Sequence, residues 1–116
     1  MDFSGVSAVL EAERSETLSR IAALNQELDD IMSAGHENGD DEHDPEGATI
    51  AFERARTISL LQEARTHLSD IEDARQRVDS GTYGSCERCQ ADISPPRLAA
   101  RPSSRTCITC ASRLTR

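Results

Sequence analysis

The sequence predicts a mainly α-helical protein, an antiparallel two-helix coiled-coil hairpin followed by a small four-cysteine module. Two observations predict it: two long stretches place aliphatic side chains at helical spacing, and all four cysteines stand in two CxxC pairs. Only 3% of the 116 residues are aromatic, so burial must come mainly from aliphatic seams. We therefore expect residues 1–80 to form the hairpin and residues 81–116 to form the module.

The first helix is predicted from about residue 4 to residue 34. Four of its aliphatic residues alternate by three and four positions, which is the spacing of a coiled-coil seam. Gly35 follows the last periodic residue and is predicted to end this helix. The apolar positions are Val6, Leu10, Leu18, Ile21, Leu24, Leu28 and Ile31.

The second helix is predicted from about residue 45 to residue 80. It begins at Asp44-Pro45-Glu46, which has a capping residue, a first-turn proline and an acidic side chain at the positive helix end. Gly81 is predicted to end it. Its apolar positions are Ile58, Leu61, Ala64, Leu68, Ile71 and Val78.

Each predicted helix has one apolar face and gains too little burial to stand alone in water. The shortest solution is to fold the two helices against each other as an antiparallel hairpin. Self-association through the same seam is the alternative, and of the two we expect a monomer.

The connecting segment, residues 35–47, is rich in carboxylates. One interpretation is a solvated acidic turn. The other is a tip whose carboxylates meet a cationic surface or a metal-bearing cavity, because carboxylate oxygens are the ligands that hard cations prefer. The carboxylates are Glu37, Asp40, Asp41, Glu42, Asp44 and Glu46.

The cysteines form the pairs Cys86-x-x-Cys89 and Cys107-x-x-Cys110, separated by 17 residues. A CxxC turn aims both sulfurs at one point, and two such turns complete a tetrahedron around zinc at about 2.3 Å. Disulfides or a redox dithiol fit less well, because no apolar signal segment begins the chain and redox pairs usually come singly. We predict one structural zinc ion in a zinc-finger module.

Charge is divided unevenly along the chain. Residues 1–80 carry 19 acidic and 7 basic side chains, whereas residues 81–116 carry 2 acidic and 6 basic ones. A DNA-binding protein needs a basic surface that releases counterions, so sequence-specific DNA binding is disfavoured. No run approaches the roughly 20 apolar residues of a membrane helix, and we expect a cytoplasmic protein. Every basic residue is Arg, which favours a bacterium with a GC-rich genome.

The C-terminal motif resembles the DksA/TraR family of zinc-finger regulators, which bind RNA polymerase through its secondary channel. The resemblance covers about residues 20–114, including the acidic-tipped hairpin. Gln90 stands where the family usually has Gly. The matching positions are Gly81, Thr82, Tyr83, Gly84, Cys86, Cys89, Ile93, Arg97, Leu98, Ala100, Pro102, Cys107 and Cys110.

The resemblance implies that the hairpin enters the polymerase channel and that its tip approaches the catalytic magnesium. In the family the tip carries Asp-x-x-Asp-x-Ala, and the nearest match here is Asp41, Asp44 and Glu46, with Glu in place of Ala. These three residues are the predicted partner-binding tip.

No nucleophile–base pair, phosphate-binding glycine loop or zinc site with a water position is visible, so we do not expect an enzyme. A transcription regulator that binds RNA polymerase is the expected function. A zinc-stapled coiled-coil adaptor with another protein partner, or a nucleic-acid-binding zinc ribbon, are the alternatives.

Overall fold

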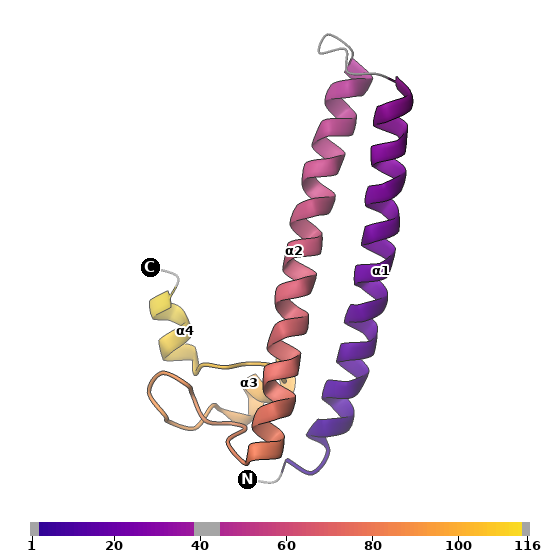
Figure 1. Cartoon of the computed structure of the whole chain (residues 1–116). Coiled ribbons are helices and arrows are strands. Elements are labelled where there is room, and N and C mark those ends of the chain that lie inside the picture. Colours follow the sequence, from indigo (N-terminus) through magenta and orange to yellow (C-terminus); the bar gives the residue numbers. More distant parts are fainter. Residues whose placement is uncertain (1–2, 39–44, 115–116) are drawn as a thin grey trace. The chain divides into compact units, whose positions relative to one another are not determined.

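The computed structural model describes residues 3–38 and 45–114. Its helices are α1 (Val6–Asn38), α2 (Pro45–Ser80), α3 (Pro95–Ala100) and α4 (Ile108–Leu114) (Figure 1). The predicted fold class is confirmed: two long helices form a hairpin and a cluster of four cysteines follows them. No helix among the described residues is both long enough and apolar enough to cross a membrane.

The chain divides into two compact units. The finger unit comprises residues 1–16 and 67–116, and the hairpin unit comprises residues 17–66. Each unit therefore contains a part of α1 and a part of α2. The sequence-based division at residue 80 follows the end of α2 and remains a prediction.

In the hairpin unit, α1 and α2 lie side by side and antiparallel (Figure 1). Leu24, Leu61 and Ala64 are buried between them. Partly buried aliphatic side chains extend this cluster, namely Ile21, Leu28 and Leu60. The cluster is narrow because each helix contributes one stripe of side chains, as the three-four spacing predicts.

Two threonines, rather than two predicted aliphatic residues, are buried in the hairpin unit. Leu18 and Ile58 are 39% and 38% exposed, whereas Thr17 and Thr57 are 6% and 1% exposed. Thr17 lies seven residues from Leu24, so it occupies a seam position that hydrophobicity alone did not reveal. The seven-residue repeat, and not the apolar character of each residue, decides which side chains face inward.

Gly35 does not end the first helix, because α1 continues to Asn38. A Cβ atom at this position would lie 3.2 Å from Cγ2 of Ile50 on α2. The missing side chain lets the two helices approach closely, which explains a glycine inside a helix. The predicted start at Pro45 and the predicted end before Gly81 are confirmed.

In the finger unit, one apolar cluster joins the helices to the four-cysteine module. Leu10, Ile71 and Ala74 of α1 and α2 are 0% exposed and pack with residues of the module. The module contributes Tyr83, Cys86, Ile93, Leu98 and Cys110 to the same cluster. Tyr83, Ile93 and Leu98, three of the positions that match the family motif, thus serve as packing residues of the module.

Ion pairs border this cluster. Arg14 pairs with Glu72, and Arg75 reaches Glu11 at 3.2 Å and Glu72 at 3.5 Å. Each of these side chains is at least 35% exposed, so solvent screens the pairs and each contributes little to stability. Each helix contributes one basic residue and at least one acidic residue to these pairs. Opposite charges therefore meet in this alignment of α1 with α2.

Gly81 and Gly84 connect α2 to the module, with φ values of 78° and 90°. Both lie in the left-handed region that glycine enters without strain. Gly84 has a second reason to be glycine, because a Cβ atom would lie 2.7 Å from Cζ of Phe3. The Phe3 and Tyr83 rings form a T-shaped pair, with centroids 4.9 Å apart and planes at 87°.

Replacing Leu61 by Asp puts an unpaired charge at a position that is 3% exposed. We expect the free energy of unfolding to fall by at least about 3 kcal/mol, measured by urea denaturation followed by circular dichroism. The control is Glu63→Ala on the exposed side of the same turn, which should change it by no more than about 0.5 kcal/mol. Equal losses would contradict the assignment of the buried seam.

Candidate metal centre

The first cysteine pair lies in a tight backbone loop after Gly84. The Cys86 amide donates to the Ala91 carbonyl at 2.8 Å, and the Gln90 amide donates to the Cys86 carbonyl at 2.9 Å. Gln90 has a φ of 64°, so this position does require the left-handed conformation that the family's glycine adopts easily. The strain of a non-glycine residue there costs about 1 kcal/mol.

The second pair lies at the start of α4. Cys107 directly precedes the helix and Cys110 is in its first turn. The Ala111 amide donates to the Cys107 carbonyl at 2.9 Å, which fixes the spacing of the two cysteines. The two pairs are also joined by their backbones, since the Glu87 amide donates to the Arg105 carbonyl at 3.0 Å.

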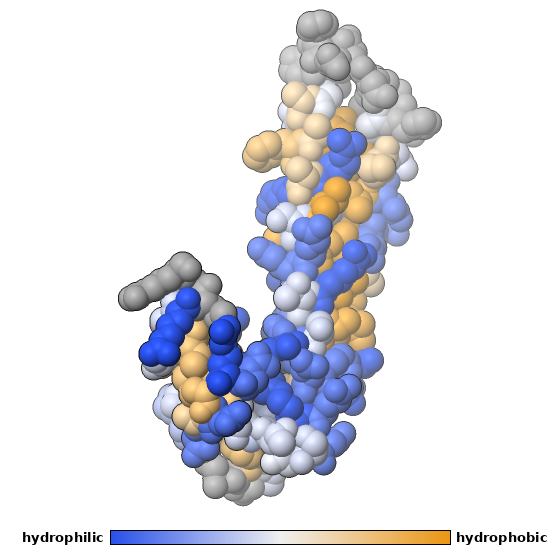
Figure 2. Space-filling model, turned by 60° about the vertical axis from the view of Figure 1, so that its left-hand side comes forward, coloured by the Kyte–Doolittle hydropathy of each residue, from blue (hydrophilic) through white to orange (hydrophobic). Residues whose placement is uncertain are grey.

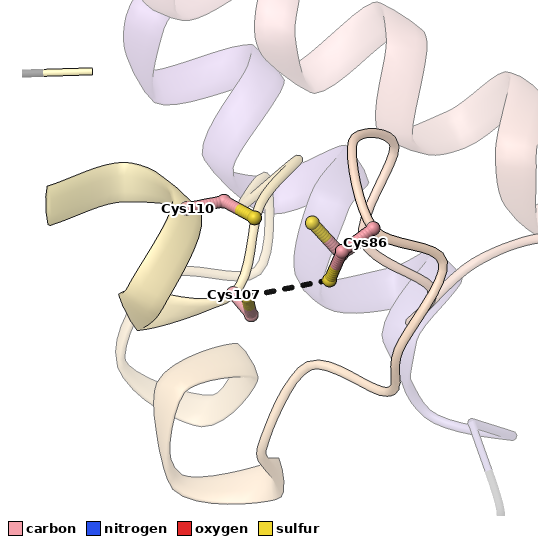
Figure 3. A group of neighbouring side chains, drawn as sticks. Cys86, Cys107 and Cys110 are labelled. Atoms are coloured by element: carbon pink, nitrogen blue, oxygen red, sulfur yellow. Dashed lines mark hydrogen bonds between the residues drawn. The ribbon is translucent and has the colours of Figure 1, made fainter. Parts of the chain in front are cut away.

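The four sulfurs converge on one point. All of them lie within 4.8 Å of one another, and those of Cys89 and Cys107 are 3.8 Å apart. Figure 3 shows Cys110 on α4 and Cys86 on the opposite loop, with their side chains pointing toward each other. Four sulfurs at about 2.3 Å from zinc would be about 3.8 Å apart, so the arrangement suits a tetrahedral zinc ion. None of the four cysteines forms a disulfide.

The site is closed in the way expected of structural zinc. Cys86 and Cys110 are buried, Cys107 is partly buried and Cys89 is exposed. With four sulfur ligands no coordination position remains for water or substrate, so the ion would serve folding rather than catalysis. When bound, zinc supplies a cross-link between the two cysteine pairs.

Backbone amides prepare two of the sulfurs to bind a cation. Hydrogen bonds from the backbone of Cys89 and then of Cys107 lower the pKa of Cys86 to about 6. The backbone of Cys110 likewise lowers the pKa of Cys107. The hydrogen bond between the Cys110 and Cys107 side chains raises the pKa of Cys110 to about 12. A divalent cation favours the thiolate form of every ligand, so binding must release the Cys110 proton.

Arg105 attaches the module to α2, a role that sequence reasoning missed. Its Nε lies 2.9 Å from Oδ1 of Asp70, and its Nη2 lies 2.6 Å from Oδ2 of Asp73. The acidic partners of Arg105 thus lie on α2 of the same chain. Asp70 and Asp73 are three residues apart on a helix, a spacing that could have suggested a shared cation.

Further side chains hold the backbone between the two cysteine pairs. The Tyr83 hydroxyl donates to the Pro102 carbonyl at 2.7 Å, and the Arg97 Nε donates to the Thr106 carbonyl at 2.9 Å. Burial raises the pKa of Tyr83, opposed by the nearby charge of Arg77. Tyr83 therefore remains a hydrogen-bond donor at neutral pH.

The predicted tip is only partly within the described residues. Asp41 and Asp44 lie outside them. Glu46 is the second residue of α2, and the structure does not describe its side chain. The tip residues therefore remain a prediction, whereas all four predicted zinc ligands lie in one cluster.

We expect metal analysis of the purified protein to find one zinc ion per chain. Chelation should unfold residues 81–116 and leave much of the hairpin helical, because a structural site contributes its binding free energy to folding. Limited proteolysis with and without chelator measures this, and Cys107→Ser should act like chelation. Unchanged protease resistance of residues 81–116 in zinc-free protein would contradict the assignment.

Replacing Arg105 by Ala removes both contacts to α2 while keeping all four sulfurs. The side chains are 32–44% exposed, so we expect a loss of only about 1 kcal/mol in unfolding free energy. Zinc stoichiometry should not change, and amide exchange in residues 103–107 should accelerate. Arg101→Ala removes an exposed arginine from the same module and serves as the control. Identical exchange in the two variants would show that Arg105 does not fasten the module.

Comparison with known proteins identifies the module. Residues 81–116 match the family described as the prokaryotic dksA/traR C4-type zinc finger. An uncharacterized protein of Aquifex aeolicus is 45% identical over 104 residues, which cover 90% of this chain and 63% of that protein. General stress protein 16O of Bacillus subtilis is 28% identical over 99 residues, which cover 85% of this chain and 55% of that protein. The chain thus spans less than two thirds of either relative.

The fold also matches a solved structure. The transcription factor DksA2 of Pseudomonas aeruginosa superimposes with a TM-score of 0.74 at 29% identity, covering 95% of this chain and 80% of that one. The similarity extends over the hairpin as well as the module, and the four clustered cysteines agree with a structural zinc ion. This chain therefore carries the C4-type zinc finger of the DksA/TraR family in residues 81–116, and its fold is similar to that of DksA2.

Proposed function

We propose that this protein is a cytoplasmic transcription regulator that binds RNA polymerase and inserts its acidic-tipped hairpin into the secondary channel. The observation that carries the proposal is the match to a transcription factor over 95% of the chain, which includes both long helices. The resemblance that the sequence bears to the DksA/TraR family implies this partner and this route. The protein acts as a monomer and has no catalytic role of its own.

The division of charge supports a protein partner rather than nucleic acid. Within residues 1–80 the acidic side chains outnumber the basic ones by 19 to 7. A hairpin of this charge is repelled by a phosphate backbone but suits a channel that carries basic side chains or a metal ion. The small excess of arginine in residues 81–116 is partly used within the chain, since Arg105 is paired with Asp70 and Asp73.

A structural adaptor for a different protein would share the zinc site and the hairpin. One measurement distinguishes the regulator from the adaptor: the binding of purified core RNA polymerase to the immobilised protein. Retention of polymerase at physiological salt supports the regulator, and failure to retain it favours the adaptor. A salt-dependent shift of duplex DNA would instead favour a nucleic-acid-binding zinc ribbon.

The acidic tip is proposed to act on initiation while the rest of the protein provides binding. Asp41→Asn combined with Asp44→Asn removes two charges and keeps the shape of the side chains, and Asn caps a helix almost as well as Asp. We expect polymerase binding to change by less than about threefold and the effect on initiation to fall by about tenfold or more. Transcription with purified polymerase at matched occupancy measures both.

The control for the tip is Glu27→Gln combined with Glu63→Gln, which removes two exposed carboxylates from the helices instead. Its effect on initiation should equal that of the unmodified protein. If the tip variant also behaves like the unmodified protein, the tip is only a solvated turn.

A further inference from the structure

Three of the four zinc ligands are embedded in the finger unit. Cys86 and Cys110 are 1% and 6% exposed and belong to the apolar cluster that includes Leu10 and Ile71. Cys107 is partly buried and packs against the same cluster. Figure 3 shows the side chains of these three cysteines close together, between α4 and the loop opposite it. Their sulfurs are therefore held by packing as well as by the metal.

Hydrogen bonds hold two of these three sulfurs more firmly still. Three backbone amides donate to the sulfur of Cys86, and one donates to the sulfur of Cys107. The donors to Cys86 belong to Cys89, Cys107 and Arg88, and the donor to Cys107 belongs to Cys110. Withdrawing either sulfur from the site would break these bonds.

The loop of the first cysteine pair contrasts with this packing. Ser103, Ser104 and Thr106, which precede the second pair, are buried. Every residue from 87 to 92 in the first loop is exposed instead. This exposed run contains Cys89, the one exposed ligand of the four. Solvent therefore reaches the zinc site at Cys89.

The surface of the module leaves room for a donor molecule to approach. On the face drawn in Figure 2, hydrophobic residues of the module, in orange, reach the surface between hydrophilic ones in blue. Charged side chains thus form no continuous cover over this face, and a neutral or an anionic donor meets no unbroken layer of like charge there.

Gln90 adds strain directly after the exposed ligand. Its φ is 64°, in the left-handed region that a residue with a side chain enters at a cost. Its amide donates to the Cys86 carbonyl at 2.9 Å and so closes the first loop. A loop released from the metal relaxes this backbone, whereas the metal-bound loop keeps it strained. The strain therefore favours opening of the loop at Cys89 and lowers the affinity for zinc.

The four ligands differ in what their withdrawal would cost. Zinc with four sulfur ligands has no open position, so exchange of the metal requires one ligand to be displaced. Displacing Cys86 or Cys110 would expose the apolar cluster to water. Displacing Cys89 exposes no buried side chain and releases the strain at Gln90.

We propose that Cys89 and Gln90 form the exchangeable corner of the zinc site, where zinc enters and leaves the protein. An incoming sulfur or nitrogen donor forms a bond to zinc as the bond between zinc and the Cys89 sulfur breaks. The leaving thiolate keeps the electron pair of that bond and takes a proton from water, so nothing is oxidised or reduced. Cys86, Cys107 and Cys110 hold the ion during the exchange. This inference concerns the metal and does not depend on binding to the polymerase.

Transfer of zinc from the zinc-loaded, full-length protein to the coloured chelator 4-(2-pyridylazo)resorcinol tests the role of Gln90. Gln90→Gly removes the backbone strain and should slow the transfer by about threefold or more. Gln90→Ala removes most of the side chain but keeps the strain, so its rate should stay within about 1.5-fold of that of the unmodified protein. Equal rates in Gln90→Gly and the unmodified protein would overturn the inference. Equal slowing in both variants would overturn it as well, because the side chain and not the backbone would then govern the exchange.

Alkylation of the zinc-loaded protein by iodoacetamide tests the role of Cys89. Among molecules modified once, peptide mass spectrometry should find at least about tenfold more modification at Cys89 than at any other cysteine. Cys89→Ser should keep the zinc ion and a protease-resistant module, whereas Cys107→Ser should lose both. Equal modification of another cysteine, or loss of zinc from Cys89→Ser, would show that exchange does not take place at this corner.

Discussion

The finger unit depends on one shared apolar cluster, in which metal ligands and helix residues are packed together. Cys86 and Cys110 belong to the same cluster as Leu10 and Ile71. Zinc therefore does more than close a loop, because it fixes two of the side chains against which α1 and α2 pack. In a chain with two phenylalanines, one tyrosine and no tryptophan, such a cross-link replaces the bulky residues that usually fill a core.

Much of this arrangement could be predicted from the sequence, because the signals are geometric. Two CxxC pairs allow few arrangements other than a four-sulfur site, and Gly81 marks the end of α2. The extent of α1 was predicted less well, since Gly35 has the appearance of a stop signal. Its actual role depends on Ile50 across the hairpin, and such a contact between distant residues leaves no local trace in the sequence.

The composition of the seam shows a second limit of sequence reasoning. Thr17 and Thr57 are buried, although hydrophobicity favoured their neighbours Leu18 and Ile58. A strict seven-residue count from Leu24 places Thr17 in the seam. Hydrophobicity alone instead predicted that Leu18, the next residue, would be buried. The attachment of Arg105 to Asp70 and Asp73 was missed for a related reason, because ion pairs between distant segments follow from the fold and not from local spacing.

Phe3 occupies the space left by the missing side chain of Gly84 and forms a T-shaped ring contact with Tyr83. The residues of the zinc finger are contiguous in the sequence, but some of the residues that pack against them come from the first helix and from the residues before it. A fragment made of residues 81–116 would retain every sulfur and still lose Phe3, Leu10 and Ile71 from around Tyr83, Ile93 and Leu98. Such a fragment would bind metal with its apolar side chains exposed to water, so its metal affinity and solubility would underestimate those of the intact protein. A bulky tag fused close to Phe3 would disturb the zinc-finger module from the opposite end of the sequence.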